Sequence, residues 1–179
     1  MILENVRIPK QNVIGEVNKG WYVAMTTFTF ERGTAIFERQ SHFMTELMEL
    51  AKLCENIKVP GTEQSVVKNP YYRQKFAQSF IEFAILRYHG LQMLSQLLND
   101  GKLGPEASLA KVYYTEAHQR FTELSMEVQS QSGNYWGSRG LTQEFFQQTY
   151  LDSRAETIYA GTSQIQRNIL AERVLGMPR

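Results

Sequence analysis

The residues whose types and spacing most clearly suggest ligand binding lie near the end of the sequence, between Tyr159 and Arg167. Gly161 allows a tight backbone turn immediately before a predicted helix. The N–H groups at the start of that helix have no partner within it and could bind an anionic or carbonyl-rich ligand. Ser163 and Gln166 have the spacing of a capping box, so a well-capped helix without a ligand is the alternative, and these residues alone favour it.

A second candidate is the segment from Phe28 to Gly33, where a carboxylate interrupts aromatic and hydroxyl side chains. If this face lines a ligand cavity, the loss of water would raise the pKa of Glu31 and make its carboxylate a usable general base. Arg32 projects about 100° away from Glu31 on a helix, so it could hold a separate anionic or carbonyl group. The alternative is a solvated Glu–Arg pair on a helix surface.

The other reactive residue types give little support for catalysis. His42, His89 and His118 are far apart in the sequence and show no metal-ligand spacing, so we expect structural roles and no metal site. Cys54 falls on an apolar helix face, which favours a buried structural thiol over a nucleophile. The glycines between positions 133 and 140 do not form a GxGxxG motif after a strand, so no Rossmann phosphate loop is expected.

The composition is that of an ordinary globular chain of 179 residues, with 42% hydrophobic and 21% charged residues. The net charge of +1 gives no reason to expect a nucleic acid or an anionic membrane as partner. A single cysteine excludes an internal disulfide and fits a reducing compartment. Neither a membrane-spanning run nor a signal or transit pattern is visible, so we expect a cytoplasmic protein, or a mitochondrial matrix protein if the source is eukaryotic.

Amphipathic periodicity predicts the elements that must position these residues. A first long helix is expected over about 21–57, and a second begins at Pro70 and ends at the Asn-Asp-Gly of 99–101. A third helix opens at Gly104-Pro105 and a loop follows it from Ser130 to Leu141. Shorter helices are expected from a Thr142 cap to about Arg154 and from about Thr162 to Leu175. The apolar stripe of the second helix is predicted to consist of Phe76, Phe80, Phe83, Leu91, Leu94 and Leu98.

These elements predict an all-α fold, an up-and-down four-helix-type bundle with additional short helices, over residues 21–179. Residues 1–20 differ, because the β-rich run from Val6 to Pro9 is stopped by proline and followed by glycines. We expect this segment to be a short strand or extended stretch plus a connector.

The stretch from Ile158 to Gly176, IYAGTSQIQRNILAERVLG, closely resembles the C-terminal signature of the acyl-CoA dehydrogenases. The opening, from Val6 to Trp21, is similar to the end of that family's β-domain, and Phe30-Glu31-Arg32 to the entry into its C-terminal helical domain. Arg73-Gln74-Lys75-Phe76-Ala77 and Glu116-Ala117-His118-Gln119-Arg120 also resemble family sequences. The resemblance covers essentially the whole chain.

The resemblance implies a flavoprotein in which FAD accepts a hydride from the β-carbon of an acyl-CoA thioester. A carboxylate removes the α-proton, and the product is a trans-2-enoyl-CoA. In most of the family this carboxylate stands directly before Gly-Thr, where the present chain has Ala160. A minority places the glutamate before an arginine on the first long helix of the domain, so the resemblance makes Glu31 the candidate base.

The resemblance also assigns binding roles. The residues expected to contact substrate are Phe28, Arg32 and Tyr159. Those expected to contact FAD are Gly161, Thr162 and Gln164, with Gln129 and Gly133 matching a loop that reaches the FAD of a neighbouring subunit. The family's Arg-Phe-Gly grip on the FAD pyrophosphate has no counterpart at positions 57–63, where Lys58 could supply only a point charge.

Two hypotheses follow from this resemblance. In the first, the chain is the C-terminal domain or a fragment of an acyl-CoA dehydrogenase that forms a dimer, a tetramer or a complex of unlike subunits. Family members with this signature are roughly twice this length, because substrate and FAD lie between the bundle and two preceding domains. The isolated chain is therefore expected to be inactive. In the second, the chain is a non-catalytic helical oligomerisation or subunit module without independent FAD binding.

Overall fold

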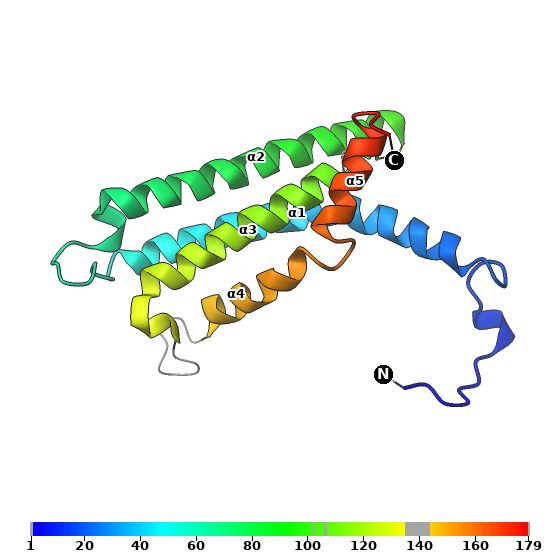
Figure 1. The fold of residues 1–179 in the computed structure, drawn as a ribbon, viewed down its shortest axis with the longest axis horizontal. Helices are drawn as coiled ribbons and strands as arrows, with labels where there is room; N and C mark the ends of the chain where they lie inside the picture. The colour runs from blue at the N-terminus through cyan, green and yellow to red at the C-terminus, as the bar shows by residue number, and fades with distance from the viewer. Residues whose placement is uncertain (1, 102, 106, 135–143, 179) are drawn as a thin grey trace.

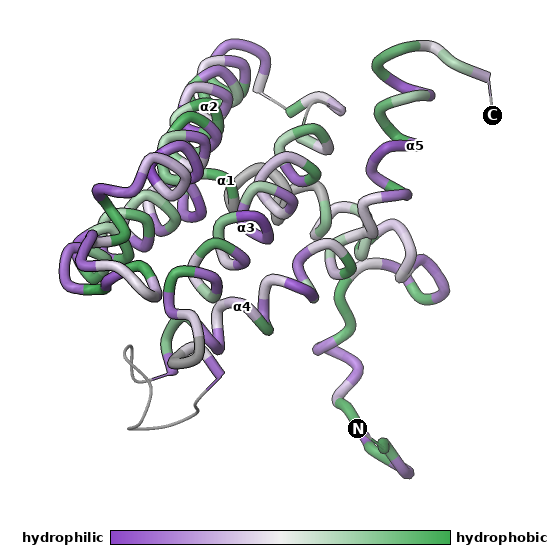
Figure 2. The backbone as a smooth tube through the Cα atoms, turned by 60° about the vertical axis from the view of Figure 1, so that its left-hand side comes forward, coloured by the Kyte–Doolittle hydropathy of each residue, from purple (hydrophilic) through white to green (hydrophobic). Residues whose placement is uncertain are grey.

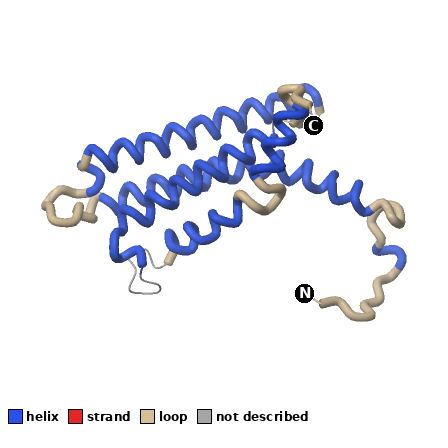
Figure 3. Tube along the Cα trace, in the orientation of Figure 1, coloured by secondary structure: helices blue, strands red, loops and turns tan. Residues whose placement is uncertain are grey.

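The computed structural model describes residues 2–101, 103–105, 107–134 and 144–178, and for residues 29–35 and 131–132 it describes the backbone alone. Its long elements are α1 (Gly20–Cys54), α2 (Pro70–Asp100) and α3 (Ala107–Gln129), followed by α4 (Phe145–Glu156) and α5 (Ser163–Arg173). Single turns of 3-10 helix occupy Lys10–Asn12, Val66–Lys68 and Ser130–Asn134. The described residues form no β-strand, and the all-α prediction is confirmed (Figure 3).

Helices α1, α2 and α3 run up and down side by side, α4 packs along α3, and α5 crosses one end of the bundle (Figure 1). Hydrophobic and hydrophilic residues alternate in short stretches along the helices, as two-faced helices require (Figure 2). Phe43 of α1, Phe83 of α2 and Phe121 of α3 pack against one another through the core, the first pair tilted and the second edge to face, with successive ring centroids 5.4 Å apart. The bundle therefore has one continuous aromatic core from three helices.

The ends of α2 follow the local sequence. Asn69 precedes the helix, and its side-chain oxygen accepts a hydrogen bond of 3.0 Å from the N–H of Tyr71. Pro70 occupies the first turn, and Gly101 ends the helix with a left-handed φ of 68°. Both predicted boundaries are confirmed. At α4 the residue before the helix is Glu144, and the predicted cap Thr142 lies outside the described residues.

The buried face of α2 is not the predicted one. Its buried side chains include Phe83, Leu86 and Met93, whereas Phe80 is 52% and Leu98 is 77% exposed. Apolar residues occupy several faces of this helix, so their spacing alone does not select one. The polar residue Glu82 turns inward instead, because Arg120 of α3 pairs with it at 3.0 Å. The prediction that Leu91 and Leu94 complete the inner stripe is also wrong, since both are exposed.

The first part of the chain lies outside the bundle. Residues 2–19 run as an exposed segment with one 3-10 turn and lead away from the helices, as does the beginning of α1 (Figure 1). Its apolar side chains lie uncovered, and Trp21 is 70% exposed. The expected run from Val6 to Pro9 is not paired with another strand among the described residues. Ile36 is the first described side chain of α1 that is fully buried.

Candidate functional site

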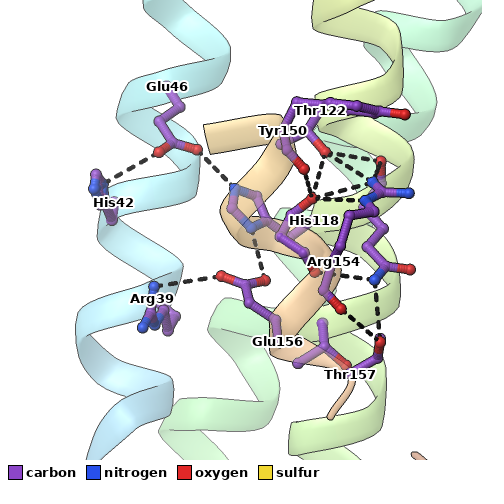
Figure 4. Close-up of polar contacts among 12 residues, drawn as sticks. Arg39, His42, Glu46, His118, Thr122, Tyr150, Arg154, Glu156 and Thr157 are labelled. Atoms are coloured by element: carbon purple, nitrogen blue, oxygen red, sulfur yellow. Dashed lines mark hydrogen bonds and ion pairs between the residues drawn. The ribbon is translucent and has the colours of Figure 1, made fainter. Parts of the chain in front are cut away.

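Four charged side chains from three helices meet inside the bundle in what we call the polar layer: Arg39 and Glu46 of α1, His118 of α3 and Glu156 of α4 (Figure 4). Nδ1 of His118 lies 2.8 Å from Oε2 of Glu156, and Nε2 lies 3.1 Å from Oε2 of Glu46. Nη1 of Arg39 lies 3.6 Å from Oε1 of Glu156. The imidazole and both carboxylates are buried, so these contacts are shielded from solvent.

The surroundings of His118 favour its charged form. Burial by itself lowers the pKa of the imidazole, but the hydrogen bonds to Glu156 and Glu46 and the negative charges of both carboxylates raise it, and the net direction is upward. The ring of Phe43 stacks on the imidazole with centroids 3.9 Å apart, and an aromatic face stabilises a cation. The polar layer therefore stabilises an imidazolium.

Further hydrogen bonds hold the end of α4 against α3. The buried ammonium of Lys111 donates to the backbone carbonyl of Glu156 at 2.8 Å. The side-chain amide of Gln119 donates to the carbonyl of Ser153 at 2.9 Å and to the hydroxyl of Thr157 at 3.2 Å. These bonds satisfy carbonyl groups that a helix end leaves without intrahelical partners. They fix the point from which the next turn departs.

That turn connects α4 to α5 and contains the predicted glycine. Ala160 and Gly161 both have a left-handed backbone, with φ of 52° and 93°. The N–H of Ser163 donates back to the carbonyl of Thr157 at 3.0 Å, and the side-chain amide of Gln166 donates to the carbonyl of Ala160 at 2.9 Å. The prediction of a tight turn at Gly161 is confirmed.

The helix cap differs from the predicted one. The hydroxyl of Thr162 accepts a hydrogen bond of 3.2 Å from the N–H of Ile165, so Thr162 is the N-cap of α5. The predicted capping box of Ser163 and Gln166 is therefore wrong by one residue. Ala160 and Gly161 both have positive φ, so the helix cannot include them. Its first residue is Ser163, and Thr162 occupies the capping position.

The start of α5 has polar atoms that no protein group satisfies. Oγ of Ser163 and Oε1 of Gln166 are buried and have no hydrogen-bond partner among the described residues. Native proteins rarely leave buried polar atoms unpaired, so each points to a missing group. The hydroxyl can donate or accept, the amide oxygen accepts, and the helix start favours negative charge. Phosphates and hydroxyls of a flavin cofactor have this chemistry, so the residues present fit FAD.

Four of the predicted site residues come together in this turn. They are Tyr159, Gly161, Thr162 and Gln164, and the first and last of them are exposed. Glu31 and Arg32 lie within α1, but their side chains are outside the described residues. Glu31 precedes Arg39 by eight positions, which is about 12 Å along a helix axis. Phe28 is partly buried in the same stretch of α1.

The remaining two predicted residues lie at the other end of α3, away from the start of α5 (Figure 1). The amide of Gln129 donates to the carbonyl of Ser125 at 2.9 Å and accepts from the amide of Gln147 at 3.5 Å. Gly133 is buried, and a Cβ atom there would stand 3.3 Å from the carbonyl oxygen of Met126. Within one chain, the structure does not bring this pair together with the α4–α5 turn.

The sequence predicted no metal site, no membrane-spanning run and a buried structural thiol at Cys54. Among the described residues there is no group of three or more side chains that could hold a metal ion. None of the helices in the described part of the chain is long and apolar enough to cross a membrane. Cys54 is buried, and burial raises the pKa of its thiol to about 12, so the structural role is confirmed.

The sequence predicted a structural role for lone histidines but missed the partners of His118. Glu46 and Glu156 lie 72 and 38 positions away from it, so no local spacing connects the three residues. One signal was present on α1. Arg39, Phe43, Glu46 and Leu50 follow one another at steps of four, three and four, which places two charged residues on the face of two core residues.

Comparisons with known proteins agree with this geometry. Residues 18–175 match the family described as acyl-CoA dehydrogenase, C-terminal domain. The acyl-CoA dehydrogenase IpdE1 of Mycolicibacterium smegmatis is 32% identical over 184 residues, which cover 100% of this chain and 42% of that protein. The mitochondrial short-chain specific acyl-CoA dehydrogenase of Mus musculus is 27% identical, covering 98% of this chain and 40% of its own length.

Among solved structures, the Tcur3481-Tcur3483 steroid ACAD superposes with a TM-score of 0.83 at 22% identity, covering 98% of this chain and 44% of that one. An acyl-CoA dehydrogenase from Geobacillus kaustophilus has a TM-score of 0.79 at 22% identity, covering 96% of this chain and 43% of that one. The chain thus spans less than half the length of the relatives it matches.

Proposed function

Because the chain belongs to the acyl-CoA dehydrogenase family, whose C-terminal helical domain it matches, we propose that it acts in the α,β-dehydrogenation of an acyl-CoA thioester with Glu31 as the base. The observation that carries this proposal is the α4–α5 turn. Its family-typical base position is occupied by Ala160, which has no proton-accepting side chain. The ion pair between Arg39 and Glu156 ties the end of α4 to the same helix that carries Glu31.

In the proposed reaction, FAD, when bound, supplies the hydride acceptor. The carboxylate of Glu31 takes the proton from the α-carbon, and closure of the site around the substrate would raise the pKa of this carboxyl toward the range useful for a base. Arg32 holds the carbonyl end of the substrate and orders the adjoining turn. Phe28 and Tyr159 line the acyl chain, and their aromatic rings exclude water from it.

The cofactor would be held by the start of α5. Thr162 and Gln164 flank Ser163, whose buried hydroxyl lacks a partner among the described residues. Gly161 allows the chain to approach the cofactor closely because it has no side chain. We also propose that the segment with Gln129 and Gly133, at the far end of α3, lies against the FAD of a neighbouring subunit, although both residues are buried within the single chain.

We propose that the active form is an assembly. The chain spans 42% of IpdE1, so in this proposal the substrate and FAD sites also use polypeptide outside the given 179 residues, from a longer form of the chain or from an unlike acyl-CoA dehydrogenase subunit. Contacts between the helical domains would build a homo-dimer or tetramer. One similar structure is of the ChsE4-ChsE5 complex from Mycobacterium tuberculosis. We propose the cytoplasm, or the mitochondrial matrix in a eukaryote, as the place of action.

The second candidate function is a non-catalytic helical module of such an assembly. Ala160 in the usual base position favours it. Absorbance of the purified protein separates the candidates. A colourless chain that takes up no FAD, alone or in the assembly, supports the module, and a yellow protein that reduces a dye with an acyl-CoA excludes it.

Substitution of the base tests the first candidate in the assembled dehydrogenase. Glu31→Gln should lower kcat by about 10²- to 10⁴-fold, the usual contribution of a general base. Glu38→Gln, on an exposed position of the same helix, is the control and should leave kcat unchanged. Adding Ala160→Glu to Glu31→Gln should restore part of the rate. Unchanged turnover of Glu31→Gln would contradict the assignment.

A further inference from the structure

The polar layer has a proton requirement that follows from its geometry. Both ring nitrogens of His118 lie within 3.1 Å of a carboxylate oxygen, one from Glu46 and one from Glu156. An ionised carboxylate only accepts hydrogen bonds, and a neutral imidazole has only one N–H. Two hydrogen bonds to two carboxylates therefore require the imidazolium, or one proton more than neutral histidine supplies.

The charge balance of the polar layer leads to the same conclusion. Glu46 and Glu156 contribute two negative charges, and Arg39 contributes one positive charge at 3.6 Å from Glu156. With His118 protonated, the four side chains sum to zero. Loss of the proton would remove the cation that both buried carboxylates contact, which is costly in a low-dielectric interior.

The polar layer lies next to the α4–α5 turn, so the proton of His118 affects how firmly that turn is held. Glu156 is the last residue of α4, and the left-handed pair Ala160 and Gly161 follows four positions later. His118 is held by α3, which also packs against α5. Among the described residues, the side chain of Glu156 is tied to α1 through Arg39 and through the His118 ring that Glu46 also contacts.

We propose that protonated His118 is a positioning residue that clamps the end of α4 to α1 and so fixes the α4–α5 turn. Loss of its proton releases the clamp and loosens the turn. The clamp itself stands on the contacts of this chain, while its effect on cofactor and substrate rests on the proposed function.

Every element packed around the imidazole contributes a defined group. Helix α1 supplies Glu46 and Arg39, and also His42, whose half-exposed ring lies 3.6 Å from Oε1 of Glu46. Helix α4 supplies Glu156, and α3 itself supplies the ammonium of Lys111 at the carbonyl of Glu156. Helix α2 supplies the aromatic ring of Phe83, which packs on Phe43 and Phe121.

The direction of the pH dependence follows from the sign of the shift. The pKa of His118 is raised in the folded chain above its ordinary value of 6.5. The stabilisation is therefore fully present below the pKa of the unfolded chain and is lost as the pH rises through the higher pKa of the folded chain. The turn should be tight below pH 6.5 and should loosen as the pH rises through the raised pKa of His118.

Two measurements on the 179-residue chain test the clamp. Nitrogen NMR of the histidine rings reports whether both nitrogens of His118 carry protons. Hydrogen exchange reports the protection of the amides of Tyr159 and Ser163, which donate to the carbonyls of Ala155 at the end of α4 and of Thr157 in the turn. At pH 6.5, where an ordinary histidine is half protonated, we expect a mostly doubly protonated ring. Protection factors should fall as His118 loses its proton at higher pH.

Three variants make the test specific. His42→Gln removes a surface histidine that also faces Glu46, and it should keep the pH dependence of the turn. His118→Gln should show low protection at every pH. Glu46→Gln keeps the shape of the partner but removes its charge, so the titration of His118 and the loss of protection should both move to lower pH.

The outcomes separate the clamp from the proposed function. A His118 ring that loses its proton at or below pH 6.5, or protection of the turn that does not change as His118 titrates, would overturn the clamp. If His118→Gln fails to fold, the unsubstituted chain and Glu46→Gln still decide the question. A dehydrogenase assembly without activity would count against the proposed function and leave both of these measurements unaffected.

Discussion

Two polar regions of the molecule, separated by a single turn, are built in opposite ways. In the polar layer, both ring nitrogens of His118 and the carboxylates around them find partners within the chain. At the start of α5, Oγ of Ser163 and Oε1 of Gln166 are buried without a partner among the described residues. The contacts around His118 are satisfied, although Nε of Arg39 at the edge of the polar layer lacks a partner among the described residues, while at the start of α5 two neighbouring side chains have unused capacity for hydrogen bonds.

The difference assigns different roles to the two regions. The hydrogen bonds of His118 to two carboxylates join α1, α3 and α4, and a buried network of this kind rigidifies what it joins. Buried polar atoms without partners are costly, and each calls for an explanation. In the proposed function, the polar layer supports the α4–α5 turn, and the start of α5 is the proposed binding surface.

The largest effect is expected from breaking the polar layer. Glu156→Ala leaves the buried charge of His118 with one carboxylate fewer, and it should lower the free energy of unfolding by about 3–5 kcal/mol. Urea denaturation at pH 7 measures this change. Glu123→Ala removes the exposed partner of Arg154 and should cost only about 0–1 kcal/mol. Equal losses of stability in the two variants would show that the buried ion pairs of the polar layer contribute no more than an exposed ion pair.

A smaller effect is expected from the cap that joins the two regions. Thr162→Ala removes the oxygen that accepts from the N–H of Ile165 and should cost about 1 kcal/mol. Thr149→Ala, where the hydroxyl bonds only to a carbonyl within α4, is the matched control and should stay within about 0.5 kcal/mol. Thermal or urea unfolding compares the two. A larger loss at Thr149 would contradict the role of Thr162 as N-cap.

The smallest effect on stability is expected at the unpaired hydroxyl. Ser163→Ala removes an atom that has no partner among the described residues, so the free energy of unfolding should change by less than about 0.5 kcal/mol or rise slightly. The same substitution should weaken FAD binding in the assembled dehydrogenase, measured by fluorescence titration. A clear loss of stability with unchanged FAD affinity would reverse the roles of the two regions.

The sequence predicted the parts of this architecture that local chemistry determines. Asn69, Pro70 and Gly101 mark the ends of α2, and Gly161 marks the turn, because caps and left-handed backbones depend on neighbouring residues. Which face of α2 is buried could not be read in the same way. Apolar residues surround that helix, and the inward position of Glu82 depends on Arg120 of another helix.

The two polar regions differ in the same respect. The motif around Gly161 is contiguous and could be found by its residue types. The polar layer combines residues from positions 39 to 156, and the pairing of His118 with Glu46 and Glu156 depends on how three helices pack. Charged residues that share a helix face with core residues, as Glu46 does, are the sequence feature that could have predicted it.

Hydrogen exchange of the assembled dehydrogenase with and without FAD tests the distinction between the two regions most directly. We predict that FAD increases the hydrogen-exchange protection of residues 159–167, where two buried polar atoms lack partners among the described residues. The protection of α3 around His118 should not change. Increased protection around His118 with no change at the start of α5 would contradict this prediction.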